Sequence, residues 1–359
     1  MSAETLRPDL VELERSALES ALEERRHPRF HGGQIFRWIY RHGIADVAAM
    51  TDLSRELRAS LAVDFSLSTP TLVHREKSID GTEKFLLRLS DGRQIESVFI
   101  PDTPALTFCI STQVGCAMAC AFCLTGKMGL VRNLTAGEIV GQVRVLTEAL
   151  AMRDARFNIV LMGMGEPLHN YDETMKALRI LADKQGYAMS PRRVTLSTVG
   201  LLPALEKLAR EPLMPNLAIS LHAPTDLQRG ELVPINKKYG IDDIIAACKK
   251  FPLTKRTRIT FEYVMLAGVN DSPDDARRLA KLMAGLKSKV NLIPLNAAAG
   301  IPFARPADTV VDQFAKILAE KKILVSVRKS RGRDIRAACG QLIVEGQTKS
   351  AGQQLAVTM

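Results

Sequence analysis

The sequence predicts an α/β protein: parallel strands alternating with helices in a barrel or part of one, preceded by a helical region and a small β segment. From about residue 103, short apolar runs alternate with helical stretches, as in βα units. Before that point, two Asp-Gly pairs separate alternating apolar runs, which indicates hairpins. The first 68 residues contain stretches of helical periodicity.

Composition supports a folded protein with an affinity for polyanions. The 359 residues are 46% apolar, enough for a barrel-sized domain and a smaller one. Lys and Arg outnumber Asp and Glu by 49 to 39, which gives a net charge of +10. Nucleic acid is the first candidate partner. The basic residues gather at 237–238, 249–258 and 328–336, although any single cluster is usually only a solvated face.

Residues 1–68 are expected to form a helical accessory domain that binds RNA. Residues 10–25 are charged and amphipathic, and residues 33–41 carry apolar side chains at helical spacing. Residues 69–102 are expected to form a β-hairpin connector, with turns at Asp80 and Gly81 and at Asp91 and Gly92.

Residues 103–342 are expected to form the catalytic domain, followed by a polar tail at 343–359. Six βα units predict a partial barrel whose site lies at the C-terminal ends of the strands. A further run at 323–327 is a candidate seventh strand. The six candidate strands are residues 106–111, 158–162, 194–197, 217–221, 259–265 and 290–294.

Three cysteines spaced C-x3-C-x2-C follow the first of these strands, at Cys116, Cys120 and Cys123. Three thiolates on one loop can hold three irons of a 4Fe-4S cluster and leave the fourth iron open to a substrate. A zinc site would need a fourth Cys or His nearby, which is absent. Buried structural cysteines are the other alternative, but three within eight residues are hard to explain by packing.

Other unusual sequence elements also follow directly on strands. Residues 163–167 (GMGEP) follow the second strand, Ser197 closes the third, residues 220–222 (SLH) close the fourth, and Asn296 follows the sixth. Singly, the glycines could serve turns and His222 could be a core histidine. Together they indicate one site at the C-terminal face of the barrel.

The chain has no run of 18 apolar residues, and its first residues lack the form of a signal peptide. The clustering of the cysteines, four of the six between residues 109 and 123, favours a reducing compartment in the absence of such a signal. We therefore expect a cytoplasmic protein with no membrane partner.

The motifs resemble those of one family. The cysteine loop and the GEP strand end resemble the radical S-adenosylmethionine (SAM) enzymes, and the wider set resembles the RlmN/Cfr family of RNA adenine methyltransferases. The resemblance runs from the helical N-terminal region to about residue 342. The motifs are residues 109–116 (CISTQVGC), 132–135 (RNLT), 163–167 (GMGEP), 220–223 (SLHA), 294–296 (PLN), 331–332 (RG) and 338–341 (ACGQ).

The resemblance implies roles for particular residues. It makes Cys116, Cys120 and Cys123 the ligands of one 4Fe-4S cluster. Cys339 would carry a methyl group, Cys109 would resolve the adduct through a disulfide, and Glu96 would accept a proton. Cys248 matches no family motif and is expected in the core. The residues expected to contact SAM are Gly165, Glu166, Ser197, Ser220, Leu221, His222 and Asn296.

The resemblance also implies an activity. One SAM methylates Cys339, and a second yields a 5'-deoxyadenosyl radical that removes hydrogen from this methyl group. RlmN enzymes then methylate C2 of an adenosine in 23S rRNA, many also C2 of tRNA adenosine 37, whereas Cfr enzymes methylate C8 of the ribosomal adenosine. The RlmN-like N-terminal region favours C2. An electron donor such as flavodoxin would be required. The alternative of another class is an RNA-binding protein with a cluster that does not turn over SAM.

Overall fold

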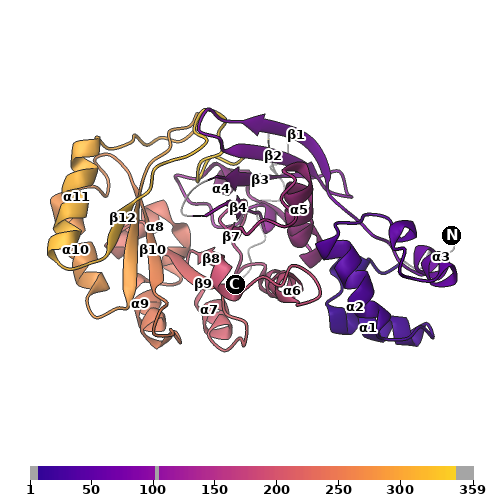
Figure 1. Ribbon diagram of the computed structural model, residues 1–359. Coiled ribbons are helices and arrows are strands. Elements are labelled where there is room, and N and C mark those ends of the chain that lie inside the picture. The colour runs from indigo at the N-terminus through magenta and orange to yellow at the C-terminus, as the bar shows by residue number, and fades with distance from the viewer. Residues whose placement is uncertain (1–6, 102–104, 345–359) are drawn as a thin grey trace.

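The computed structural model describes residues 7–101 and 105–344, and it confirms the predicted α/β class (Figure 1). One ten-stranded sheet in the described part of the chain has the order β1-β2-β3-β4-β7-β8-β9-β10-β11-β12. From β4 onward its neighbours pair in parallel. These strands are β4 (Thr107–Cys109), β7 (Asn158–Leu161), β8 (Val194–Thr198), β9 (Asn216–Ser220), β10 (Ile259–Met265), β11 (Ser288–Pro294) and β12 (Val325–Val327).

Each predicted parallel strand is present, and the candidate run at 323–327 provides β12, which pairs with β11. Helices connect the strands, as βα units require. Two of them begin with a capping box, at Thr135 and at Ser272, which satisfies amide groups of the first turn. The connecting helices are α5 (Ala136–Ala149), α6 (Tyr171–Ala182), α7 (Leu202–Leu208), α8 (Asp226–Leu232), α9 (Ile241–Lys250), α10 (Pro273–Met283) and α11 (Asp308–Glu320).

The predicted hairpins form a meander that extends the same sheet. Its strands are β1 (Thr71–Lys77), β2 (Glu83–Arg88) and β3 (Gln94–Ile100). Gly81 and Gly92 have φ values of 82° and 83° at its turns, which suits glycine. Because β3 pairs antiparallel with β4, residue Val98 lies opposite Cys109. The meander thereby connects the helical region to the edge of the parallel strands.

The N-terminal region is helical, as predicted, but residues 10–25 do not form one helix. Leu13 and Glu14 are extended and separate a short 3-10 turn from α1. Buried Leu10 and Val11 in that turn belong to the core of the sheet region. The domain limits 1–68, 69–102, 103–342 and 343–359 stay a prediction, and residues 345–359 of the predicted tail lie outside the described residues. The elements are Leu10–Glu12, α1 (Arg15–Glu24), α2 (His31–Phe36), Arg37–Arg41, Val47–Ala49 and α3 (Arg55–Asp64).

A small two-stranded sheet encloses the cysteine loop, and the sequence patterns did not reveal it. Strand β5 (Gln113–Gly115) pairs antiparallel with β6 (Leu130–Asn133), and α4 (Leu124–Met128) lies between them in the chain. Gly115 has a φ of 75°, and a Cβ there would lie 1.9 Å from the Gly129 carbonyl oxygen. Glycine at position 115 is therefore required by both conformation and space.

Candidate active site

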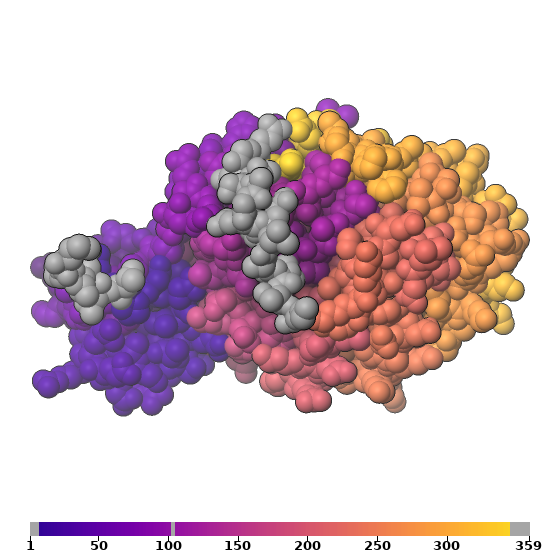
Figure 2. Space-filling model, turned by 180° about the vertical axis from the view of Figure 1, so that it is seen from behind, coloured from indigo at the N-terminus to yellow at the C-terminus, as the bar shows by residue number. Residues whose placement is uncertain are grey.

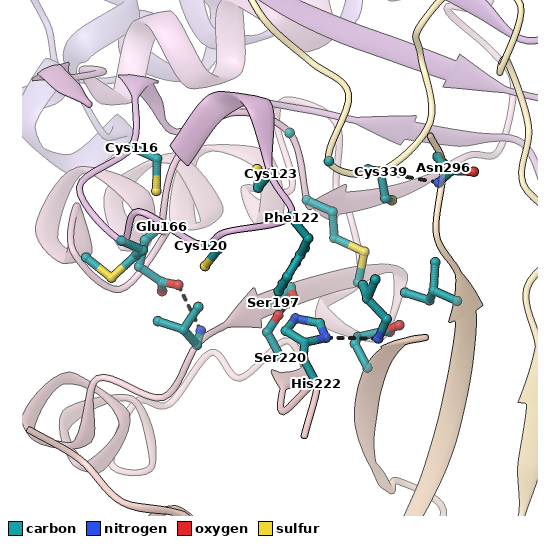
Figure 3. Close-up of a pocket in the computed structure, with 18 of the residues that line it drawn as sticks. Cys116, Cys120, Phe122, Cys123, Glu166, Ser197, Ser220, His222, Asn296 and Cys339 are labelled. Carbon is teal, nitrogen blue, oxygen red and sulfur yellow. Dashed lines mark hydrogen bonds between the residues drawn. The ribbon is translucent and has the colours of Figure 1, made fainter. Parts of the chain in front are cut away.

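A cavity at the C-terminal ends of the parallel strands gathers nearly all residues predicted to bind the cluster and SAM (Figure 3). Leu221 is the exception, because it is fully buried and does not line the cavity. Cys339 and Asn296 lie across the cavity from Cys116 (Figure 3). The predicted residues that line it are Cys116, Cys120, Cys123, Gly165, Glu166, Ser197, Ser220, His222, Asn296 and Cys339.

The cysteine loop presents three free thiols to this cavity. The Cys116 amide donates to the Gly129 carbonyl at 3.0 Å, which connects the two ends of the loop. Helix α4 packs closely on the loop, since a Cβ at Gly126 would lie 3.0 Å from the Cys120 nitrogen. Burial raises the pKa of the Cys116 thiol to about 12. Metal binding must therefore displace protons from buried thiols.

The donor set fits an iron-sulfur cluster. Within residues 7–101 and 105–344, no three His, Cys, Asp or Glu side chains are grouped closely enough to hold a single metal ion. In a cluster each thiolate binds a different iron, so the sulfur atoms stand farther apart than around one ion. The three thiols nevertheless interact electrostatically. Burial is the main cause that raises the pKa of Cys120, and negative charge on Cys123 or Cys116 raises it further.

Glu166 places a buried carboxylate beside the cysteines (Figure 3). Its Oε1 accepts from the Leu168 amide at 3.0 Å, and its Oε2 accepts from the Val199 amide at 2.9 Å. Burial raises the pKa of this carboxyl to about 7, and these hydrogen bonds limit the increase because they stabilise the ionised form. Gly165 has a φ of 107° and allows the chain to turn into the cavity. The carboxylate is suited to accept hydrogen bonds from an ammonium group.

His222, Ser197 and Ser220 form the floor of the cavity at the ends of β8 and β9. The two serine hydroxyl oxygens are 3.3 Å apart. The Val264 amide donates to His222 Nδ1 at 3.1 Å, and Phe122 meets the imidazole edge-on at 4.7 Å between ring centres. Burial lowers the pKa of His222 to about 3. The imidazole is therefore neutral, with its proton on Nε2.

Asn296 connects the cavity to the segment that carries Cys339. Its Nδ2 donates to the Cys339 carbonyl at 3.3 Å. Its Oδ1 is buried, and no described residue donates a hydrogen bond to it. Because buried polar atoms are normally paired, this oxygen is an acceptor available to a ligand of the cavity.

Cys109 and Cys339 share a second, smaller cavity next to the first. Both are free thiols, and Cys339, Asn296 and Arg328 line both cavities. Burial is the main cause that raises the pKa of Cys109; negative charge on Cys339 adds to it, whereas the Arg328 cation opposes it. The structure thus places the two predicted catalytic cysteines around one guanidinium group.

Glu96 lies outside the residues that line these cavities. Its Oε1 is 3.2 Å from Lys84 Nζ, and its Oε2 accepts from the Ile343 amide at 2.9 Å. Burial raises the pKa of this carboxyl, while Lys84 opposes the shift. It is therefore held against the segment that follows Cys339. Cys248 is buried on α9, as expected of a core residue.

Sequence patterns missed Arg328, Phe122 and Glu262, which line the main cavity. Arg328 looked like one of a row of basic residues suited to RNA. Its position one residue after β12 was the available signal, because residues there face the site in this class of fold.

The comparisons with known proteins define the class and then the family. Residues 110–280 match the radical SAM superfamily, and residues 8–66 match the ribosomal RNA large subunit methyltransferase N-terminal domain. The solved structure of a radical SAM methyltransferase from Sphaerobacter thermophilus has a TM-score of 0.89 and 47% identity, over 93% of this chain and 99% of that one. The protein is therefore a radical SAM enzyme, and it uses a 4Fe-4S cluster and SAM.

Curated relatives show the family. The dual-specificity RNA methyltransferase RlmN of Pelobacter propionicus is 46% identical over 349 residues, covering 97% of this chain and 99% of that protein. The RlmN of Syntrophotalea carbinolica is 50% identical over 316 residues, covering 88% of this chain and 84% of that protein. The chain belongs to the RlmN family. None of its described helices has the length and apolar character needed to cross a bilayer.

Proposed function

We propose that this protein methylates C2 of an adenosine in 23S rRNA and C2 of tRNA adenosine 37. The names of its relatives support two kinds of RNA substrate and methyl transfer, and the match at residues 8–66 supports ribosomal RNA. The observation that carries the proposal is the placement of Cys339. Its side chain lies between the cavity of the cluster ligands and the cavity of Cys109, so one sulfur can serve both halves of the reaction.

The chain's residues can be assigned roles on this basis. Cys116, Cys120 and Cys123 would hold the cluster. Glu166 would accept from the ammonium group of SAM, and the unpaired Oδ1 of Asn296 would accept a further hydrogen bond. The remaining contacts to SAM would come from Gly165, Ser197, Ser220 and His222. Leu221 is buried behind the residues that line the cavity and would support them from there. When bound, the cluster and SAM supply the methyl group and the radical that activates it.

The two catalytic cysteines would act in sequence. The Cys339 thiolate takes the methyl group of one SAM, so that a carbon–sulfur bond forms and S-adenosylhomocysteine leaves. After the activated methylene carbon has joined C2 of adenine, Glu96 would take the ring proton and the unpaired electron would return to the cluster, which restores an aromatic base joined to Cys339. The Cys109 thiolate would then attack the Cys339 sulfur. A disulfide forms, the carbon–sulfur bond to the base breaks with its electron pair on carbon, and a proton completes the methyl group. A reductant must restore the thiols, and a flavodoxin-type electron donor and a cytoplasmic location are part of the proposal.

Substitution of each cysteine tests this order. Cys339→Ala should yield no methylated protein and no RNA product, because the acceptor sulfur is gone. Cys109→Ala should still accept methyl and react with RNA, but it should stall as a protein joined to RNA through Cys339. Denaturing gels after incubation with SAM, reductant and RNA distinguish the two variants. Normal turnover by Cys109→Ala would exclude the covalent mechanism.

Mass spectrometry of nuclease-digested RNA tests the position of methylation. Wild-type enzyme should produce 2-methyladenosine in both 23S rRNA and tRNA transcripts. Mainly 8-methyladenosine would place the protein with the Cfr branch. A cluster that is reduced by dithionite without formation of 5'-deoxyadenosine from SAM would instead indicate an RNA-binding protein without turnover.

A further inference from the structure

A groove with a volume of about 520 Å³ lies away from the active site. We call it the basic groove and define it by five cationic residues that line it: Arg41, Arg153, Arg156, Lys184 and Arg193. None of them belongs to the basic clusters that the sequence singled out. Asp154 is the acidic residue among those lining the groove. The groove therefore has a strong excess of positive charge.

The groove lies at the opposite end of the strands from the cysteine cavity. Arg153 and Arg156 precede β7, and Arg193 directly precedes β8, so they lie at the N-terminal ends of these strands. Leu161 and Ser197, in contrast, line the active-site cavity at the C-terminal ends of the same two strands. A ligand of the groove therefore cannot be the reacting part of the substrate.

Both the helical region and the sheet region build the groove. Arg41 ends the π-helix Arg37–Arg41 of the helical region. The other four cations precede strands: Arg153 and Arg156 lie between α5 and β7, and Lys184 and Arg193 lie between α6 and β8. Arg37 Nη2 donates to Gln185 Oε1 at 2.9 Å across this junction. Figure 2 shows the indigo N-terminal region directly against the magenta and pink part of the molecule. The groove is thus formed by contacts within the folded chain.

Four of the five cations have no carboxylate partner within the described residues. Arg153 Nε donates to Glu148 at 2.9 Å, and Arg193 Nη1 donates to the Phe157 carbonyl at 3.3 Å. Arg41, Arg156 and Lys184 are exposed, and within the described ranges no acidic side chain forms an ion pair with them. Clustered cations without partners repel one another and attract a polyanion.

We propose that the basic groove binds the phosphodiester backbone of the RNA substrate at a point remote from the target adenosine. This inference rests on the proposed function, which supplies RNA as the partner. Guanidinium groups recognise phosphate oxygens through paired hydrogen bonds, and a lysine adds a point charge. Because the groove and the active site lie at opposite ends of the strands, only an RNA long enough to pass around the molecule can occupy both.

The test compares two triple variants with the same loss of charge. The first is Arg41→Gln, Arg156→Gln, Lys184→Gln. The control is Lys281→Gln, Lys316→Gln, Lys321→Gln, which removes exposed cations from α10, α11 and the residue after α11. Each is measured with a short stem-loop that carries the target adenosine and with a long 23S rRNA fragment that contains the same stem-loop. Fluorescence anisotropy at several salt concentrations gives affinity and its salt dependence, and thermal unfolding verifies that each variant is folded.

For the long RNA, the groove variant should bind about tenfold more weakly or worse, and its slope of log affinity against log salt should be smaller by about 2 to 3. The short stem-loop should bind both variants as tightly as it binds the wild type. The long RNA should bind the control variant as tightly as the wild type. Unchanged binding of the long RNA, or the same loss with both RNAs, would overturn the proposal. The proposed function fails separately, if wild-type enzyme binds RNA through the groove but methylates none.

Discussion

The backbone around His222 determines both its conformation and its charge. Its φ of 63° is in the left-handed region, which histidine tolerates better than most side chains. This conformation turns Nδ1 toward the Val264 amide and leaves the ring neutral inside the fold. Burial without a carboxylate partner has a consequence for stability in acid.

The first prediction concerns the pH dependence of stability. Since the pKa of His222 is lowered to about 3 in the fold, the unfolded chain binds one more proton between that value and its usual pKa near 6.5. The free energy of unfolding should therefore fall as pH falls from 7 to 5, by about 2 kcal/mol from this residue. His222→Asn should lack this contribution. Urea unfolding of the metal-free proteins at both pH values measures it, and equal losses in both proteins would refute it.

Arg328 is the second residue whose surroundings indicate a role in the reaction. It lines both cavities beside Cys109 and Cys339, and negative charge on Cys339 and Glu262 raises its pKa. A permanent cation at this position favours the thiolate form of Cys109.

We predict that Arg328→Met slows release of RNA from the covalent species. Without the guanidinium, the Cys109 thiolate is less stable, so the pH of half-maximal release should rise by about one unit. Arg328→Lys keeps the positive charge and should restore most of the rate near neutral pH. Single-turnover release followed on denaturing gels gives the pH profile. A uniformly slower rate with an unchanged profile would indicate a structural effect only.

At the scale of elements, the hairpin of β5 and β6 determines the shape of the cysteine loop. Its register brings Gly115 opposite Leu130, and the close approach to Gly129 leaves no space for a side chain. The thiols are therefore positioned by backbone pairing on both sides of the loop.

We predict that Gly115→Ala prevents stable cluster binding. The added Cβ would displace the Gly129 carbonyl and separate the hairpin. Gly92→Ala is the matched control, because Gly92 has a similar φ of 83° but no atom within 4 Å of the added Cβ. The control should lose only the cost of a left-handed alanine, about 1 to 2 kcal/mol. Iron content after reconstitution and thermal unfolding compare them, and normal iron content in Gly115→Ala would contradict the prediction.

The elements differ in how far the sequence could predict them. The parallel strands were correctly located because they are continuous apolar runs between helices, which is typical of strands buried on both faces. The hairpin of β5 and β6 was missed because its strands have three and four residues, too few to show a period. The predicted helix at 10–25 is interrupted because Leu10 and Val11 turn toward the sheet region, a tertiary contact without a local signal.

The candidate site was predictable where chemistry and strand position coincide, as at Cys116, Glu166 and Asn296. Glu96 came only from family resemblance, whereas Leu221 belonged to a strand-end motif, and the structure holds both outside the lining of the cavities. The basic groove had no sequence signal at all, because its cations come from three separate segments.

At the scale of the whole molecule, the helical region is connected to the catalytic part by hydrogen bonds near the start of α5 and from α6. The Gly137 amide donates to Glu12 Oε2 at 3.0 Å, and the Thr135 hydroxyl donates to Glu12 Oε1. Arg179 Nε donates to Glu14 at 2.8 Å. A carboxylate at a helix N-terminus is stabilising, so these contacts fix the orientation of the helical region.

We predict that Glu12→Ala lowers the free energy of unfolding by about 1 to 2 kcal/mol, because it leaves an amide of α5 without its partner. It should also reduce methylation of long RNA more than RNA-free SAM cleavage, since the groove loses its fixed geometry. Glu24→Ala, an exposed substitution at the end of α1, is the control. Equal reductions in the two activities would indicate general destabilisation.

The contact between Cys339's segment and the cluster loop has a consequence for biosynthesis. The Leu124 amide donates to the Gly340 carbonyl at 2.9 Å, and the Thr125 hydroxyl donates to the Leu342 carbonyl across 217 sequence positions. Because a chain is made from its N-terminus, the three cluster cysteines leave the ribosome long before the segment that covers them. The cysteine loop is therefore open to iron and sulfide until residues 339–342 have been made, and the reactive pocket can close only after that.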